Sequence, residues 1–246
     1  MIKFFRHIRR SLINQNQMGK YFKYAIGEIL LVVIGILIAL QINNWNENRK
    51  ETAEIRAILE NLHDEFSENK KLYDANISET KLAKQIGYTI MNLMGQSEEV
   101  LKTKHIDSLI YTLLEPGEFR PSENTVNDLI QSGRLRLLTN KKLKVQLYNW
   151  QSQLKDLQVA FERVELKVDN ELIPYLSKHY ALKDIDKYGD LNWKENSTLK
   201  IDKYAIFNHI EFENIVDDYL YRVVAAEKSF EKIGQIINVI IEETND

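Results

Sequence analysis

The residue most suited to chemistry in this chain is Glu28, which precedes an unbroken apolar run at residues 29–40. An ionisable group at the centre of a bilayer costs about 2.5–3.5 kcal/mol, so such a group is usually retained for a reason. Gly35 lies seven residues after Glu28, and Ala39 lies four residues after Gly35, which places the three on one helix face. Gly35 and Ala39 also form a small-xxx-small pattern that lets two helices approach closely. This face is a candidate intramembrane packing or polar site.

Three interpretations of Glu28 stay open. Its side chain can reach the membrane interface or pair with Lys20, Lys23 or Tyr24, because Glu28 lies only about one turn below that interface. It can instead hydrogen-bond across a pair of packed helices. It can also relay protons, in which case the chain would be an auxiliary subunit of an ion-driven or transport complex.

No other residues form a pattern typical of catalysis or metal binding. The five histidines are scattered without an i, i+4 pair, and the neighbours His63, Asp64 and Glu65 point to different faces of a helix. The chain has no cysteine, and no glycine-rich phosphate loop or nucleophile elbow is present. We therefore expect no enzymatic activity, no cofactor and no bound metal.

Two further surfaces are weaker candidates. Five basic residues, with no acidic residue among them, fall within eleven positions at a turn before a predicted helix: Arg134, Arg136, Lys141, Lys142 and Lys144. Such a cluster can bind a phosphorylated lipid or another anion, although a solvated turn has the same composition. Residues 181–204 are rich in aromatic side chains, which either face a partner protein or cover the end of the helical domain.

The apolar run is the element that organises the chain. Residues 22–42 supply the roughly 20 mostly apolar positions that a membrane-spanning helix needs. Tyr21, Tyr24 and Trp45 flank this segment as membrane-interface anchors. Six basic and no acidic residues lie before Ala25, so the positive-inside rule predicts a cytoplasmic N-terminus. No small-residue cleavage site follows Leu40, and we expect an uncleaved signal anchor.

These features predict three parts in a single-span membrane protein. Residues 1–23 form a basic cytoplasmic tail, either an amphipathic helix on the anionic leaflet or a tail that only sets topology. Residues 24–45 form the transmembrane helix, with the lipid bilayer as its partner. Residues 46–246 form a domain outside the cytoplasm, which carries 27 basic and 35 acidic residues. The resulting charge of −8 argues against a nucleic-acid partner.

The outer part is predicted to be all-α, an antiparallel bundle of long heptad-patterned helices that continues the transmembrane helix. Glycine and proline are few, at 9 and 3 residues, and no cysteine is available for a disulfide. Apolar residues alternate by four and three over 143–168 and again over 212–240, which is typical of helices that pack along their length. Whether these seams close within one chain or between chains stays open.

Several boundaries follow from single residues. Asn69 falls on an apolar stripe, where it either fixes helix register or occupies a partly wet position. We expect a helix to end near Gly95, Ser122 and Thr139 to begin the next ones, and Pro174 to end or kink a helix.

Three stretches together resemble a known family: MIKFFRHIRR, KYFKYAIGEILLVVIGILIALQINNWNE and SGRLRLLTNKKLKVQLYNW. The chain resembles a family of uncharacterised single-span membrane proteins of Bacteroidetes-type Gram-negative bacteria, known only as a domain of unknown function. The likeness covers nearly the whole chain and is most specific at residues 24–47. It implies an inner-membrane protein with a periplasmic helical domain, and it implies no activity.

The leading functional expectation is a membrane-anchored helical protein that acts through association, either as a homo-oligomer or with another envelope protein. The first alternative is the auxiliary subunit that uses Glu28. The second is an extracytoplasmic sensing module, which would need a partner for output because the short tail holds no output domain.

Overall fold

The computed structural model of the protein describes residue 10 and residues 18–245, with the side chain of Tyr21 left out. The described residues are helical and contain no strand. The chain divides into two compact units, Met1–Ala57 and Ile58–Asp246. The rest of the predicted basic tail, residues 1–9 and 11–17, lies outside the described residues.

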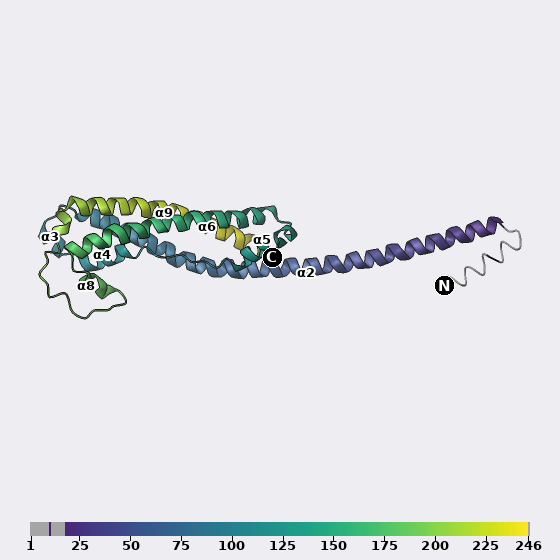
Figure 1. The fold of residues 1–246 in the computed structure, drawn as a ribbon, viewed down its shortest axis with the longest axis horizontal. Coiled ribbons are helices and arrows are strands. Elements are labelled where there is room, and N and C mark those ends of the chain that lie inside the picture. Colours follow the sequence, from purple (N-terminus) through teal and green to yellow (C-terminus); the bar gives the residue numbers. More distant parts are fainter. Residues whose placement is uncertain (1–9, 11–17, 246) are drawn as a thin grey trace. The chain divides into compact units, whose positions relative to one another are not determined.

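The longest element is α2 (Met18–Leu93), a helix of 76 residues that carries the apolar segment and runs on into the second unit (Figure 1). No proline interrupts it, which allows an uninterrupted helix of this length. Gly95 adopts a φ of +70°, a left-handed conformation that glycine reaches without strain, and the helix ends just before it. The amide of Gly95 donates to the carbonyl of Phe207 at 2.8 Å, so the predicted helix end is confirmed.

The second unit continues with short elements and then two long helices. The short elements are α3 (Glu98–Lys102), α4 (Ile106–Leu114), α5 (Asn124–Gln131) and the 3-10 turn η1 (Arg134–Leu137). The long helices are α6 (Lys141–Lys167) and α9 (Ile210–Glu243). Between them lie the π-helical turn η2 (Val168–Leu172), α7 (Ile173–His179), α8 (Leu182–Ile185) and the 3-10 turns η3 (Asp186–Tyr188) and η4 (Ala205–Asn208).

Helices α6 and α9 pack against each other in opposite directions, and Figure 1 shows them side by side. Lys142 at the start of α6 pairs with Glu243 at the end of α9, and Lys167 at the end of α6 pairs with Asp218 near the start of α9. The α2 residues of the second unit join this pair through aromatic contacts. Phe66 meets Trp150 edge to face at 4.8 Å between ring centroids, and Tyr73 meets Phe230 at 5.0 Å.

Both predicted seams are buried inside the single chain. On α6 and the following turn the buried residues are Leu143, Leu147, Trp150, Leu154, Leu157, Phe161, Val164 and Val168. On α9 they are Phe212, Val216, Tyr219, Val223, Ala226, Phe230, Ile233, Ile237 and Ile240. Burial of each large apolar side chain contributes about 1.5–3 kcal/mol before conformational entropy is subtracted. The seams therefore need no second chain to cover them.

Three boundary predictions need correction. Ser122 does not cap α5, because its hydroxyl donates to Glu65 Oε1 at 2.8 Å and the helix starts at Asn124. Thr139 does not begin α6 either: Asn140 is the N-cap and accepts from the amide of Leu143 at 3.1 Å. Pro174 does not end a helix, since it lies in the first turn of α7, although the π-helical turn η2 interrupts the α-helical geometry directly before it.

Candidate functional site

The apolar segment of α2 exposes its side chains on every side. The large apolar residues between Ile29 and Leu40 are 44% to 63% exposed, and none of the segment is buried inside the protein. Among the described residues, α2 is the one helix long and apolar enough to cross a membrane by length and composition. Water is a poor environment for so much contiguous apolar surface, which calls for lipid or another helix.

The residues predicted to form a packing face lie along this segment. Glu28 is half-buried, whereas Gly35 and Ala39 are exposed. A Cβ atom added at Gly35 would meet nothing within 4 Å, so no described part of the chain covers that position. Tyr24 and Trp45 are 53% and 64% exposed, and the guanidinium of Arg49 lies 5.6 Å from the Trp45 ring centroid. The side chain of Tyr21 lies outside the described residues.

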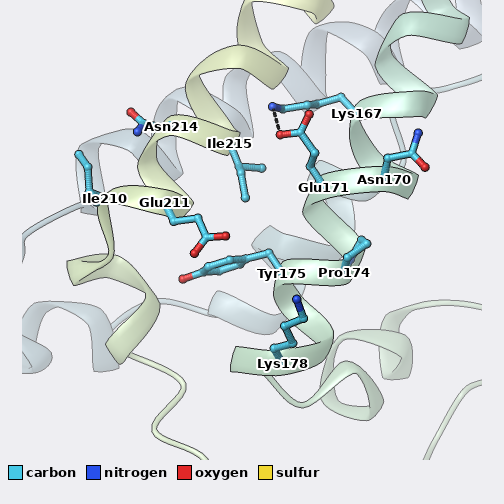
Figure 2. Close-up of a pocket in the computed structure, with 10 residues that line it drawn as sticks. All are labelled: Lys167, Asn170, Glu171, Pro174, Tyr175, Lys178, Ile210, Glu211, Asn214 and Ile215. Atoms are coloured by element: carbon cyan, nitrogen blue, oxygen red, sulfur yellow. Dashed lines mark hydrogen bonds and ion pairs between the residues drawn. The ribbon is translucent and has the colours of Figure 1, made fainter.

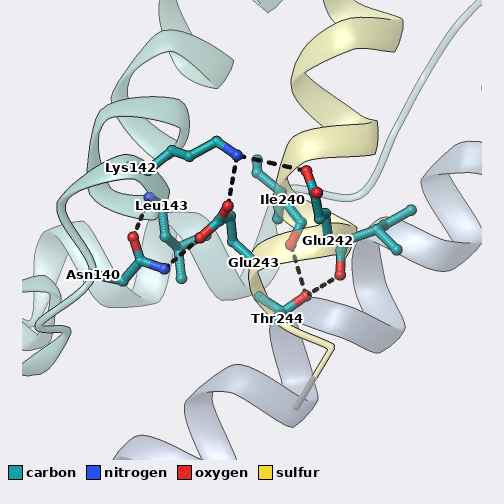
Figure 3. Close-up of polar contacts among 8 residues, drawn as sticks. Asn140, Lys142, Leu143, Ile240, Glu242, Glu243 and Thr244 are labelled. Atoms are coloured by element: carbon teal, nitrogen blue, oxygen red, sulfur yellow. Dashed lines mark hydrogen bonds and ion pairs between the residues drawn. The ribbon is translucent and has the colours of Figure 1, made fainter.

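The five basic residues of the predicted anion site do not act as one group. Arg134 forms an ion pair with Asp128. Lys142 lies 2.6 Å from Glu243 and 3.5 Å from Glu242, in a polar cluster with Asn140 (Figure 3). The hydrogen bond from Lys142 is the main reason why the pKa of Glu243 lies below its usual value, with Asn140 adding to the effect. Two of the five charges are therefore neutralised by carboxylates of the same chain.

The other three basic residues line a hollow of about 560 Å³. Arg136 comes from η1, and Lys141 and Lys144 come from the first turns of α6. The remaining lining residues are uncharged: Ile130, Gly133, Leu135, Val145 and Tyr148. Sequence spacing placed the charges near one another, but it did not separate the paired cations from those that line the hollow.

A second hollow lies beside the π-helical turn, and sequence analysis did not predict it (Figure 2). Proline at position 174 lacks an amide and its ring would clash with the carbonyl four residues earlier, at Asn170. The turn η2 lies at this point, and such turns occur frequently at functional sites. The available signal in the sequence was Pro174, which follows the heptad run at residues 143–168 by six positions.

A buried lysine stabilises this region. Lys167 is 6% exposed, and its Nζ lies 2.5 Å from Glu171 Oε2 and 2.8 Å from Asp218 Oδ2. Burial alone would lower the lysine pKa, but hydrogen bonds to Asp218 and Glu171 outweigh burial and raise it. The pKa of Asp218 is lowered, chiefly by Lys167 and further by Arg222 at 3.0 Å. Lys167 and Asp218 therefore both stay charged at neutral pH.

The hollow itself has a volume of about 510 Å³ and a lining of mixed charge. Lys178, Glu211 and the amides Asn170 and Asn214 border it, as Figure 2 shows. The Tyr175 hydroxyl lies 2.8 Å from Nδ1 of His209. Burial, helped by Glu211, raises the pKa of Tyr175 to about 12, so the phenol is neutral at physiological pH. These groups suit the binding of a small polar molecule with both charges.

The aromatic stretch at 181–204 is partly packed and partly exposed. Tyr180, just before it, is buried and donates to Asp107 on α4. Burial raises the pKa of Tyr180 far above its usual value, and the bond to Asp107 adds to the shift. Tyr188 and Trp193 are 48% and 46% exposed, and Lys183 lies over the Trp193 ring at 5.5 Å. A role of these exposed rings toward a partner protein stays a prediction.

His63 and His179 make local contacts within the helical domain. Nδ1 of His63 lies 3.3 Å from the Thr244 hydroxyl, and His179 packs on Tyr175 at 4.6 Å between centroids. Within the described ranges, no group of three or more His, Cys, Asp and Glu side chains could hold a metal ion.

Comparison with known proteins identifies a family. No curated protein and no solved structure matches the chain. A family model described as a family of unknown function, DUF6090, matches residues 28–150. This range begins at Glu28, includes every residue that lines the basic hollow, and ends before the π-helical turn. The matched residues make up half of the 246-residue chain, which therefore belongs to the DUF6090 family of unknown function.

Proposed function

We propose that the protein is a non-enzymatic, single-span protein of the bacterial inner membrane that acts through association of its membrane helix. Its basic N-terminus lies in the cytoplasm and residues 46–246 form a helical bundle in the periplasm. Support comes from the exposed apolar segment and from the six basic residues that precede it.

The observation that carries the proposal is a contrast between two apolar surfaces. The heptad seams of α6 and α9 are buried within one chain, so they offer no open surface to a partner. The face with Gly35 and Ala39 stays uncovered by the described residues. Small residues at a helix interface let backbones approach closely, and van der Waals packing then drives association in lipid. Association through the membrane helix is therefore favoured over association through the outer helices.

The mass of the full-length protein in a mild detergent, measured by multi-angle light scattering, tests this proposal. We expect a dimer or larger oligomer for the natural chain and a monomer for Gly35→Leu. Gly27→Leu is the matched control, because Gly27 also has open space around it but lies about 100° round the helix from the face. A monomeric natural chain, or equal loss of mass in both variants, would contradict association through this face.

Orientation can be tested separately because the chain has no cysteine. Single substitutions, Ser11→Cys in the tail and Ser152→Cys on the exposed side of α6, give one labelling site each. We expect a membrane-impermeant maleimide to label Ser152→Cys in intact spheroplasts and Ser11→Cys only after lysis. The reverse pattern would overturn the proposed topology.

A second candidate function, ligand sensing, is favoured by the hollow beside the π-helical turn. Its mixed lining suits small zwitterions such as amino acids. A screen of amino acids and dipeptides by thermal shift on the full-length protein tests this function. A ligand that binds there should raise the melting temperature of the natural chain, and this shift should vanish in Lys178→Gln with Glu211→Gln.

A further inference from the structure

Three basic side chains line the hollow between η1 and α6, here called the basic hollow. Arg136, Lys141 and Lys144 form no ion pair within the part of the chain that the structure describes. No acidic residue lines the hollow. Arg134 and Lys142 stand beside them in the sequence and are both paired with carboxylates. We propose that this hollow binds the phosphate group of an anionic phospholipid.

The charges alone would suit any phosphate, and the apolar lining favours a lipid. Val145 and Tyr148 are 54% and 58% exposed. They follow Lys141 by four and seven positions, so they share its face of α6. Leu135 and Ile130 complete an apolar border. Basic residues combined with exposed aliphatic and aromatic side chains are typical of surfaces at the boundary of headgroups and acyl chains.

This inference rests on the proposed function, since membrane anchorage places the protein on a membrane that contains anionic phospholipid.

The test uses the full-length protein released from a mild detergent into an intact-complex mass spectrometer. It is incubated with short-chain phosphatidylglycerol, which is anionic, or with phosphatidylcholine of the same chain length. The test variant is Arg136→Gln with Lys141→Gln and Lys144→Gln. The matched control is Lys81→Gln with Lys155→Gln and Lys232→Gln, three exposed lysines of the second unit that line neither described hollow. The natural chain and both variants keep the basic N-terminus, so any lipid binding by the N-terminus is the same in all three.

We expect the natural chain and the control to retain phosphatidylglycerol in preference to phosphatidylcholine. The test variant should lose about a hundredfold in phosphatidylglycerol affinity and little in phosphatidylcholine affinity, since each of its three substitutions removes a basic residue that contributes about fivefold near a lipid surface. Added salt should weaken the phosphatidylglycerol preference. Equal retention by the test variant and the control would overturn the proposal.

A competition arm separates the lipid from its headgroup. Glycerol phosphate that displaced phosphatidylglycerol at equal concentration would show a general phosphate site and would overturn the assignment to a lipid. Carbonate extraction of membranes from cells that produce the natural chain tests membrane anchorage independently. A protein extracted by carbonate contradicts the proposed membrane span whatever the lipid result, because short-chain lipids reach the hollow without a membrane.

Discussion

Asn69 on α2 and Ser122 in the segment before α5 exchange two hydrogen bonds. Nδ2 of Asn69 donates to the Ser122 carbonyl at 2.8 Å, and Oδ1 accepts from the Ser122 amide at 2.8 Å. Asn69 is 1% exposed. A buried asparagine here satisfies both backbone groups of a residue outside the helices, and neither predicted role, a helix register or a partly wet position, describes it.

Replacing Asn69 by leucine should destabilise the second unit. The change leaves the amide and carbonyl of Ser122 without partners, and each unsatisfied buried group costs about 1–3 kcal/mol. We expect a loss of about 2–4 kcal/mol, measured as a fall in the urea midpoint of the full-length protein. Asn76→Leu is the control, since Asn76 accepts one hydrogen bond from the amide of Glu118 at a more exposed position. This substitution should lower the free energy of unfolding by less. Equal losses would contradict the role of burial.

The heptad seams could be predicted from the sequence, whereas the hydrogen bonds of Asn69 could not. Apolar spacing predicted the buried faces of α6 and α9 because each helix repeats its own pattern along the chain. The partner of Asn69 lies 53 residues away in a segment without periodicity, so no local signal identified it. The same holds for Lys167 and Asp218, whose pairing depends on two helices meeting. The basic cluster was predicted by composition, but its division into paired and unpaired charges required the fold.

Gly234 on α9 lies so close to the ring of Tyr73 that a side chain at this position would clash with the ring. A Cβ atom there would lie 2.9 Å from Cε1 of Tyr73 and closer still to Cζ and Oη of the same ring. The Tyr73 ring packs against Phe230 at 5.0 Å and Phe119 at 6.4 Å, so it has little room to move. Gly234→Ala should cost about 1–3 kcal/mol from overpacking, although alanine normally stabilises a helix.

A double-mutant cycle provides the control for that prediction. Tyr73→Leu shortens the side chain that blocks position 234, and the cost of Gly234→Ala should fall in its presence. Thermal unfolding of the four full-length proteins measures the coupling. Strictly additive losses would show that the tyrosine is not the obstacle.

The ion pairs of Lys167 should depend on pH in a defined window. The pKa of Asp218 is lowered on folding, so its contribution is complete above its ordinary value of 3.8 and is lost as pH falls through the folded value. The pKa of Lys167 is raised, so its contribution is complete below 10.5 and is lost as pH rises through the folded value. Stabilisation by this cluster should therefore be constant from about pH 4 to 10.

Lys167→Met should remove that stabilisation. Because Asp218 and Glu171 are 38% and 51% exposed, we expect a modest loss of about 1–2 kcal/mol near pH 7. The difference in melting temperature between the variant and the natural chain should narrow below pH 4. Lys102→Gln is the control, since its pair with Glu98 is exposed on both sides and should matter little at any pH. A difference that stays unchanged in acid would contradict the ionic explanation.

Asn140 has two roles that a series of substitutions can separate. Its Oδ1 accepts from the amide of Leu143 at 3.1 Å and caps α6, and its Nδ2 donates to Glu243 at 2.6 Å (Figure 3). Asn140→Asp keeps an oxygen for the cap but replaces the donor with a negative charge beside Glu243. Asn140→Ala removes both interactions, and loss of the cap alone costs about 1 kcal/mol.

Amide hydrogen exchange in the full-length protein distinguishes the two roles by location. In Asn140→Asp, exchange should rise in the last turn of α9 and stay unchanged in the first turn of α6, because the cap survives while the carboxylates repel. In Asn140→Ala it should rise at both places. Faster exchange in α6 alone for both variants would mean that Asn140 does not hold the end of α9, and that Lys142 alone keeps Glu243 in place.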